Sequence, residues 1–176
     1  MKNAALTVNS LMKMKQDGEK IAMLTCYDAT FASEMDQAGV DIILVGDSLG
    51  MVVQGGGSTV GVEVADIAYH TACVAAGINR IFLLADMPFG SYHDPITAFE
   101  NAVSLLSAGG HMVKLEGAGP MIEVVEYLTS RGVPVCGHLG LTPQSVHQLG
   151  GYRVQARLEE EAGQLLRDAR ELQDAG

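Results

Sequence analysis

The stretch HMVKLEG, residues 111–117, combines the pattern of a buried strand with two opposite charges. Val113 and Leu115 are apolar, whereas Lys114 and Glu116 are charged and stand two residues apart. Because side chains alternate between the faces of a strand, Lys114 and Glu116 share one face and the apolar pair shares the other. Charged side chains are rarely buried unless they are paired or bind a ligand. The two charges therefore form either a salt bridge at a solvated edge or the lining of a site.

Four other stretches have the length and composition of buried strands. They are short, rich in branched apolar residues and bounded by Gly, Asp or Pro. Their apolar residues run nearly without interruption, which is typical of parallel strands that are covered on both faces. These stretches are IAMLTCYD (21–28), DIILVGDS (41–48), IFLLADMP (81–88) and VPVCGHLG (133–140).

Amphipathic stretches separate and flank the expected strands. Several end in glycine, which helix C-termini prefer, and in the last one we expect Leu158, Leu165, Leu166 and Leu172 to face the core. The expected helices lie in residues 8–18, 29–39, 64–77, 95–110, 120–132 and 157–176. Strand alternating with helix predicts an α/β protein with a single domain, residues 1–176. The pattern alone leaves open a doubly wound sheet and part of a (β/α)8 TIM barrel.

The composition argues against several classes of partner and location. The chain has 176 residues, of which 48% are hydrophobic, and 11 basic against 21 acidic residues give a net charge of −10. This charge repels nucleic acid and anionic lipid, so neither is an expected partner. No apolar run approaches the roughly 18 residues that span a bilayer. The three cysteines form no CxxC pair, which fits a reducing compartment. We therefore expect a soluble, cytoplasmic protein.

Ionisable residues stand where four of the expected strands end. Asp47, Asp86, Glu116 and His138 close the second, third, fourth and fifth strands. The carboxyl ends of parallel strands form one rim, where active sites of α/β proteins lie. Three carboxylates in a pocket of low dielectric constant repel one another unless a cation or protons neutralise them. Oxygen ligands favour Mg²⁺ or Mn²⁺, so the pattern predicts a site for such an ion.

Each of these residues also has a structural interpretation. Aspartate after a strand is often a helix N-cap or a turn former, which applies to Asp47 and Asp86. His138 alone would be typical of a hydrogen-bonded structural histidine. The glycine-rich stretch QGGGSTVG (54–61) lacks the spacing of a phosphate-binding loop and is interpreted as a flexible loop. An HExxH motif is absent from the sequence, which disfavours the zinc-dependent hydrolases that carry it.

Taken together, the strand ends and their flanking segments resemble the ketopantoate hydroxymethyltransferases. The resemblance implies a (β/α)8 barrel, assembled as a homo-oligomer, that requires Mg²⁺. It also implies transfer of a hydroxymethyl group from methylenetetrahydrofolate to 3-methyl-2-oxobutanoate, a step of pantothenate biosynthesis. The matching stretches are KMKQDGEKIAMLTCYD, ILVGDSLGMVVQG, ADIAYHTACV, LLADMPFGSY, AFENAVSLLSAGGHMVKLEG and VPVCGHLGLTPQSVHQLGGYRVQ.

The resemblance also assigns roles to individual residues. It implies that Asp47, Asp86 and Glu116 belong to the metal site, and that Asp47, Ser48, Asp86 and Lys114 contact the keto acid. In such a site the metal acts as a Lewis acid on the keto group, which eases removal of the neighbouring C–H proton. On this interpretation, Lys114 and Glu116 face a metal-bound keto acid.

The sequence departs from the family pattern in two places. The family more often has a QGH segment where this chain has QGGGSTVGV, and a barrel needs about 250 residues. About five βα units are present, and the family's general-base glutamate falls beyond Gly176. We therefore expect a fragment or a short relative that turns over poorly. Two alternatives stay open: a non-catalytic barrel fragment that binds ligands or other chains, and an enzyme of the phosphoenolpyruvate mutase and isocitrate lyase type.

Overall fold

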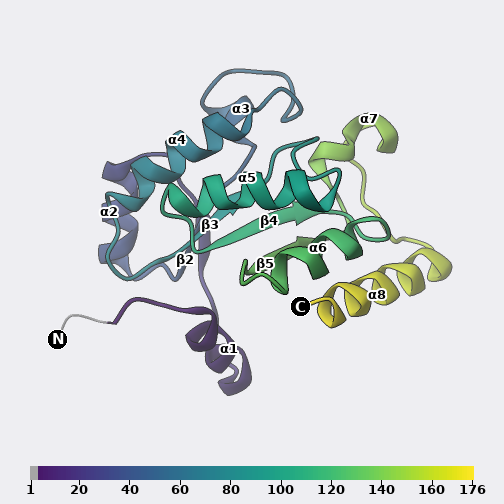
Figure 1. Ribbon diagram of the computed structural model, residues 1–176, viewed down its shortest axis with the longest axis horizontal. Helices are drawn as coiled ribbons and strands as arrows, with labels where there is room; N and C mark the ends of the chain where they lie inside the picture. The colour runs from purple at the N-terminus through teal and green to yellow at the C-terminus, as the bar shows by residue number, and fades with distance from the viewer. Residues whose placement is uncertain (1–3) are drawn as a thin grey trace.

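The computed structural model describes residues 4–176 and contains one sheet of five parallel strands (Figure 1). Its spatial order, β1-β2-β3-β4-β5, is the same as the order along the chain. A doubly wound sheet reverses its strand order at a switch point, whereas a (β/α)8 barrel adds each strand beside the previous one. The observed order therefore confirms a partial barrel of five βα units. The strands are β1 (Met23–Thr25), β2 (Ile42–Val45), β3 (Phe82–Asp86), β4 (Met112–Glu116) and β5 (Val135–His138).

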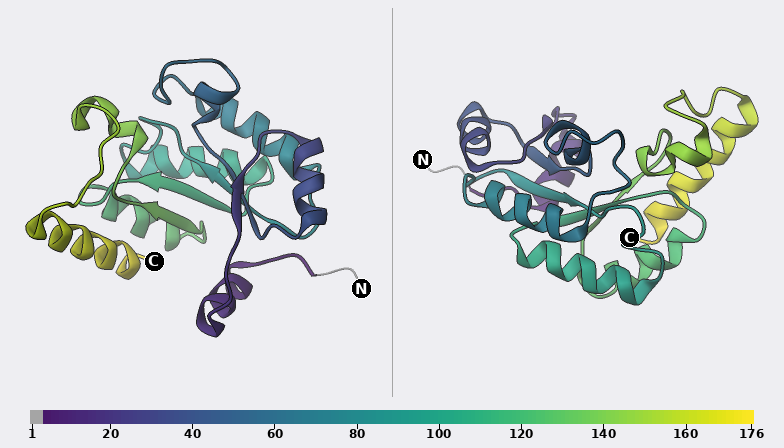
Figure 2. Two further views of the ribbon diagram at one scale, coloured as in Figure 1. Left: turned by 180° about the vertical axis from the view of Figure 1, so that it is seen from behind. Right: turned by 90° about the horizontal axis from the view of Figure 1, so that it is seen from above.

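The longer helices alternate with the strands along the chain and lie side by side in space. Neighbouring helices in the order α2, α4, α5, α6 and α8 contact one another, and α4, α5 and α6 also pack on β3, β4 and β5 respectively (Figure 2). All six expected helices are present: α1 (Val8–Asp17), α2 (Ala29–Ala38), α4 (Val64–Ala75), α5 (Pro95–Ser107), α6 (Met121–Thr129) and α8 (Glu159–Asp174). Three short segments were not expected, namely α3 (Leu49–Val52), η1 (Pro143–Ser145) and α7 (Val146–Leu149).

Side-chain caps fix where two of the helices begin. The Asp28 carboxylate accepts hydrogen bonds from the N–H groups of Thr30 and Phe31 at the start of α2. Asp94 accepts from Ile96 and Thr97 in the same way at the start of α5. Such caps satisfy N–H groups that have no partner within the helix. Asp28 and Asp94 therefore show the hydrogen bonds that an N-cap aspartate makes in this chain, and the bonds of Asp47 and Asp86 can be compared with them.

The strand register divides the sheet into two faces of different character. On the face covered by helices, Ile43 pairs with Leu83 and Ala85 pairs with Val113, and all four are completely buried. On the other face, Leu84 pairs with Met112, Asp86 with Lys114, and Glu116 with His138. Burying an aliphatic side chain stabilises the fold by about 1.5–3 kcal/mol, so the first face anchors the sheet. The second face carries the polar groups Asp86, Lys114, Glu116 and His138.

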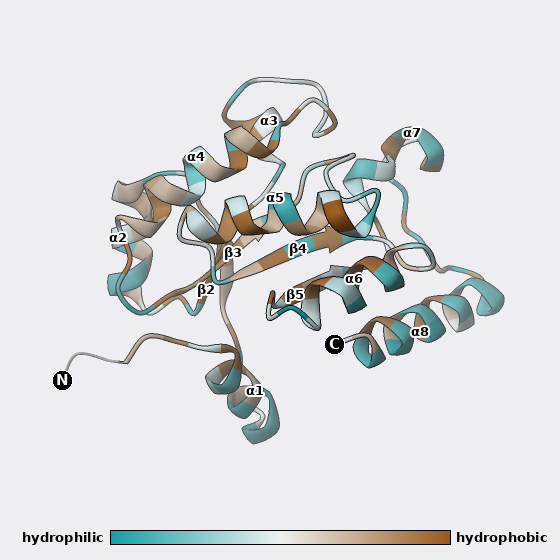
Figure 3. Cartoon of the chain, viewed as in Figure 1, coloured by the Kyte–Doolittle hydropathy of each residue, from teal (hydrophilic) through white to brown (hydrophobic). Residues whose placement is uncertain are grey.

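Helix α8 differs from the expectation in which leucines it buries. Leu172 packs against the core, and a Cβ added to Gly137 of β5 would meet Leu172 Cδ1 at 3.0 Å, so the helix lies close to the strand. Leu158 and Leu166, however, are 65% and 61% exposed, and their expected place in the core was wrong. Within residues 4–176, the main helix contact of α8 is with α6, and none of the residues of α8 is fully buried. Figure 3 shows that much of α8 is hydrophilic.

Two further features bear on the expectations. The outer strands of the described sheet are β1 and β5, and Met23 and Leu24 of β1 are each 50% exposed, so β1 forms an open edge. Among the residues described, no helix combines the length and apolarity needed to cross a membrane.

Candidate active site

The strand-end residues converge at one end of the sheet, as their positions in the sequence predict. Asp47 lies two residues after the end of β2, Asp86 ends β3, and Lys114 and Glu116 lie on β4. All four are buried, with exposed fractions of 4%, 2%, 8% and 6% in that order. His138, at the end of β5, is paired with Glu116 across the strands. The second face of the sheet therefore ends in a cluster of buried charges.

Lys114 lies at the centre of this cluster. Its Nζ donates to Asp86 Oδ1 at 2.6 Å and to Glu116 Oε1 at 3.4 Å. Strand β4 is an inner strand and the pair is buried, so a salt bridge at a solvated edge is excluded. Burial alone would lower the pKa of Lys114, but the carboxylates of Asp86, Glu116 and Asp47 outweigh it and raise the pKa above its ordinary value. The ammonium form of Lys114 is thus stabilised.

The two aspartates face each other across neighbouring strand ends. The backbone N–H of Asp47 donates to Asp86 Oδ2 at 3.2 Å. Burial raises the pKa of Asp86 to about 6, assisted by the Asp47 charge and opposed by Lys114. Burial likewise raises the pKa of Asp47. Neither carboxylate caps the segment that follows it in the way that Asp28 and Asp94 do, which argues against the N-cap interpretation.

Glu116 is held by donors on both of its oxygens. Oε1 lies 3.1 Å from His138 Nδ1 in addition to its contact with Lys114, and Oε2 accepts the backbone N–H of Gln144 at 3.1 Å. Burial alone would raise the pKa of Glu116, but His138, Lys114 and the Gln144 N–H together lower it. The Glu116 carboxylate therefore stays ionised, and the contact is attractive when His138 Nδ1 carries the proton.

Gln144 and Tyr92 belong to the same network, although no pattern in the sequence indicates either residue. Gln144 lies in the loop after β5 and is only 4% exposed. Its Nε2 donates to Asp47 Oδ2 and to the carbonyl of Met87, both at 2.9 Å, and its Oε1 accepts from the Tyr92 hydroxyl. Because Gln144 lies in the short η1 segment and Tyr92 in a loop, no strand or helix periodicity marks either side chain as buried.

Ser48 and Thr59 bring hydroxyl groups to the neighbourhood of Asp47. Ser48 Oγ lies 2.8 Å from the Tyr27 hydroxyl, so the side chain predicted to contact substrate is already positioned by a tyrosine. Thr59, from the glycine-rich stretch 54–61, is 2% exposed, and its hydroxyl lies close enough to the Asp47 carboxylate to lower the pKa of Asp47 slightly against the effect of burial. The flexibility of residues 54–61 stays a prediction, although the Thr59 side chain within this stretch is buried.

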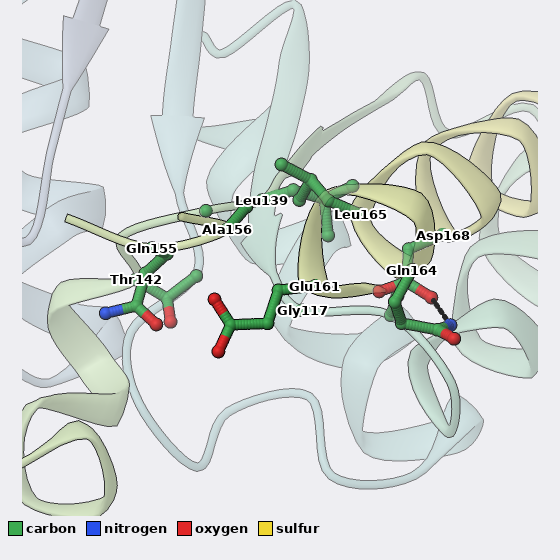
Figure 4. Close-up of a pocket in the computed structure, with 11 residues that line it drawn as sticks. Gly117, Leu139, Thr142, Gln155, Ala156, Glu161, Gln164, Leu165 and Asp168 are labelled. Carbon is green, nitrogen blue, oxygen red and sulfur yellow. Dashed lines mark hydrogen bonds between the residues drawn. The ribbon is translucent and has the colours of Figure 1, made fainter. Parts of the chain in front are cut away.

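A cavity of about 380 Å³ adjoins the charged cluster (Figure 4). It lies between the loops that follow β4 and β5 and the helix α8. Gly117, which directly follows Glu116, lines one side, and the Glu161 side chain projects toward Thr142 and Gln155. The full lining is Gly117, Ala118, Leu139, Gly140, Thr142, Gln155, Ala156, Glu161, Gln164, Leu165 and Asp168.

The oxygens of the cluster fit a Mg²⁺ site made by two carboxylates. Within residues 4–176, no group of three His, Cys, Asp or Glu side chains is arranged to hold a metal ion. Glu116 accepts bonds on both oxygens, and so does Asp86, from Lys114 and from the Asp47 N–H, so direct coordination of the ion by either residue stays a prediction. Asp47 and Asp86 are neighbours, and two carboxylates are enough, because Mg²⁺ is commonly bound by one or two carboxylates and completes its shell with water and substrate oxygens.

Sequence comparisons connect the whole described chain with one group of enzymes. The model of the family described as "Ketopantoate hydroxymethyltransferase" matches residues 5–176. The 3-methyl-2-oxobutanoate hydroxymethyltransferase of Thiobacillus denitrificans is 58% identical over 172 residues, covering 97% of this chain and 66% of the relative. The enzyme of the same name from Methylobacillus flagellatus is 60% identical over 168 residues, covering 95% of this chain and 64% of the relative. The chain thus spans about two thirds of these relatives' length.

Structural comparisons identify the same type of barrel at low sequence identity. A phosphonopyruvate hydrolase in complex with oxalate and Mg²⁺ superposes with a TM-score of 0.72 at 12% identity, covering 97% of this chain and 61% of that one. A 2,3-dimethylmalate lyase of the phosphoenolpyruvate mutase and isocitrate lyase superfamily gives a TM-score of 0.65 at 16% identity, with coverage of 97% and 61%. At such identity the likeness shows the fold alone.

Proposed function

The chain belongs to the ketopantoate hydroxymethyltransferase family, and from that membership we propose that it acts in the transfer of a hydroxymethyl group from methylenetetrahydrofolate to 3-methyl-2-oxobutanoate, giving ketopantoate. One observation within the site supports the proposal most strongly. The buried Lys114 is bonded to Asp86 beside Asp47, so a cation and two carboxylates stand where an anionic keto acid and a divalent ion would meet. Assembly into a homo-oligomer and a cytoplasmic location are further parts of the proposal.

Asp47 and Asp86 are the residues proposed to hold Mg²⁺. When bound, Mg²⁺ supplies Lewis acidity that polarises a keto group and eases removal of the proton from the neighbouring carbon. The raised pKa of each aspartate reflects burial of a charge without enough compensation, and a divalent cation would supply that compensation. Glu116 is also proposed to belong to the metal site. It would act indirectly, by holding Lys114, His138 and the backbone N–H of Gln144 in place.

Lys114 and Ser48 are proposed to bind the keto acid. The raised pKa of Lys114 keeps its ammonium group charged, so it would attract the substrate carboxylate at a buried position where charge is poorly screened. Ser48 offers a hydroxyl whose position is set by Tyr27. Asp47 and Asp86 lie beside these two residues, since Ser48 directly follows Asp47 and Lys114 Nζ lies 2.6 Å from Asp86 Oδ1. No residue of 4–176 is proposed as the base, because the carboxylates of the cluster are engaged in binding.

A second candidate function is binding of the same ligands without turnover. The observation that favours it is the open edge of the sheet at β1, where Met23 and Leu24 are half exposed. The named relatives at 58% and 60% identity favour the transferase over an enzyme of the phosphoenolpyruvate mutase type.

Turnover and binding are separated by one experiment. The chain is incubated with 3-methyl-2-oxobutanoate, Mg²⁺ and methylenetetrahydrofolate, and ketopantoate is measured beside a sample of the Asp86→Asn variant. Ketopantoate formed by the unaltered chain and not by the variant supports the transferase. Calorimetric binding of the keto acid without product supports the second candidate, and the absence of both binding and product contradicts the two proposals.

A further inference from the structure

One residue, Gln144, bonds two of the carboxylates in the cluster around Lys114. Gln144 donates through Nε2 to Asp47 Oδ2 and to the Met87 carbonyl, both at 2.9 Å, and accepts through Oε1 from the Tyr92 hydroxyl. Its backbone N–H donates to Glu116 Oε2 at 3.1 Å. A single residue thus holds one carboxylate with its side chain and another with its backbone.

The amide has no freedom to turn around within this set of bonds. The Met87 carbonyl and the Asp47 carboxylate can only accept hydrogen bonds, so they both require the NH₂ group. The Tyr92 hydroxyl donates to the remaining oxygen and also accepts the backbone N–H of Glu116 at 3.3 Å. With Gln144 4% exposed and Tyr92 8% exposed, water does not replace these partners easily.

A neutral amide suits a position between two carboxylates. A positive side chain at Gln144 would compete with a cation for Asp47, and a negative one would add to the repulsion among Asp47, Asp86 and Glu116. The amide instead fixes one oxygen of Asp47 without neutralising the charge. It also anchors η1, and with it the loop after β5, onto the charged cluster.

We propose that Gln144 is a positioning residue, which orients the Asp47 carboxylate toward the ion and substrate and is itself held by Tyr92. The part of the inference that concerns Mg²⁺ rests on the proposed function, whereas the contact between Gln144 and Asp47 does not. Groups that hold a metal-binding side chain typically change metal affinity by about 10- to 100-fold when they are removed.

The contact is tested without metal by NMR of side-chain amides. Gln164 on α8 is a matched reference, because its Nε2 donates to Asp168 Oδ1 at 2.7 Å in an exposed setting. The Gln144 and Gln164 amide resonances are assigned from the variants Gln144→Leu and Gln164→Leu. We expect Asp47→Ala to shift the Gln144 pair and to leave the Gln164 pair unchanged, and Asp168→Ala to do the reverse. If the chemical shifts of the Gln144 amide pair do not change in Asp47→Ala, the inference is overturned.

The consequence for the site is tested by calorimetric titration with Mg²⁺ alone. Gln144→Leu is expected to weaken binding by about 10-fold or more, with Gln37→Leu, a change at an exposed position of α2, binding as the unaltered chain does. Thermal melting checks that each variant is folded, and Tyr92→Phe, which removes only the hydroxyl that holds the amide, should give a smaller loss in the same direction. Should Gln144→Leu fail to fold, Tyr92→Phe decides the question. Unchanged Mg²⁺ affinity in the folded variants overturns the inference. If the unaltered chain binds no Mg²⁺, the proposed metal site is refuted, and the NMR test alone decides whether Gln144 contacts Asp47.

Discussion

Two lysine–aspartate pairs in this molecule have the same length and opposite surroundings. Lys13 Nζ lies 2.6 Å from Asp17 Oδ2 on α1, where the two side chains are 73% and 54% exposed. Lys114 Nζ lies 2.6 Å from Asp86 Oδ1 at the strand ends, where the exposed fractions are 10% and 2%. Distance alone therefore says little about what a pair does. The exposed pair is solvated with or without its partner, whereas each member of the buried pair depends on the other.

The largest expected effect is the loss of the buried cation. Lys114→Met leaves the Asp86 and Glu116 carboxylates buried without their shared partner, and breaking a buried pair in this way costs about 3–5 kcal/mol. Lys13→Met makes the same chemical change at the surface and should cost about 0.3–0.5 kcal/mol. Urea unfolding of the two variants measures both values. Equal stability of the two variants would show that burial does not distinguish the pairs.

The next effect is a pH dependence that arises from Asp86. Its folded pKa of about 6 lies above the unfolded value, so its contribution to stability is complete below the unfolded pKa and is lost as the pH rises through 6. The loss amounts to about 2–3 kcal/mol between pH 4 and pH 7. Asp86→Asn removes this titration, so the stability of the unaltered chain relative to the variant should fall over that range. A flat or rising difference, measured by denaturant unfolding, contradicts the assignment.

Mg²⁺ should distinguish the two aspartates of the comparison. At about ten times its dissociation constant, a ligand that binds only the folded state stabilises it by about 1.4 kcal/mol. We expect this gain in the unaltered chain and in Asp17→Asn, and we expect none in Asp86→Asn. Melting temperatures with Mg²⁺ and with EDTA provide the measurement. A gain that survives in Asp86→Asn would place the ion elsewhere.

The smallest effect concerns salt. In a double-mutant cycle, the coupling between Lys13 and Asp17 should be about 0.3–0.5 kcal/mol at low ionic strength and should nearly vanish in 1 M NaCl. The coupling between Lys114 and Asp86 should change little, because ions do not reach a buried pair. Two couplings that weaken to the same degree would mean that solvent enters the strand-end cluster.

The sequence was sufficient for the parts of the molecule that follow a regular period. Alternation along β4 placed Lys114 and Glu116 on one face, and the strand ends located Asp47 and Asp86, because the carboxyl ends of parallel strands meet. The order of the strands was not determined by pattern alone, and only the observed order excluded a doubly wound sheet.

The sequence was insufficient where irregular loops bring distant residues together. Gln144 lies 97 positions from Asp47, and no local pattern indicates that the loop after β5 folds back onto the cluster. In the same way, no local pattern indicates that Tyr92 contacts the cluster. For Leu158 and Leu166, apolarity suggested burial, but the contact between α8 and its neighbours is too narrow to cover them.

The most direct test of the account is calorimetric titration of 3-methyl-2-oxobutanoate into the chain with and without Mg²⁺. The buried charges are interpreted as a site in which the keto acid and the ion depend on each other. The account predicts binding that requires Mg²⁺, is lost in Asp86→Asn and is retained in Asp17→Asn. Binding of equal strength without Mg²⁺, or in Asp86→Asn, would contradict it.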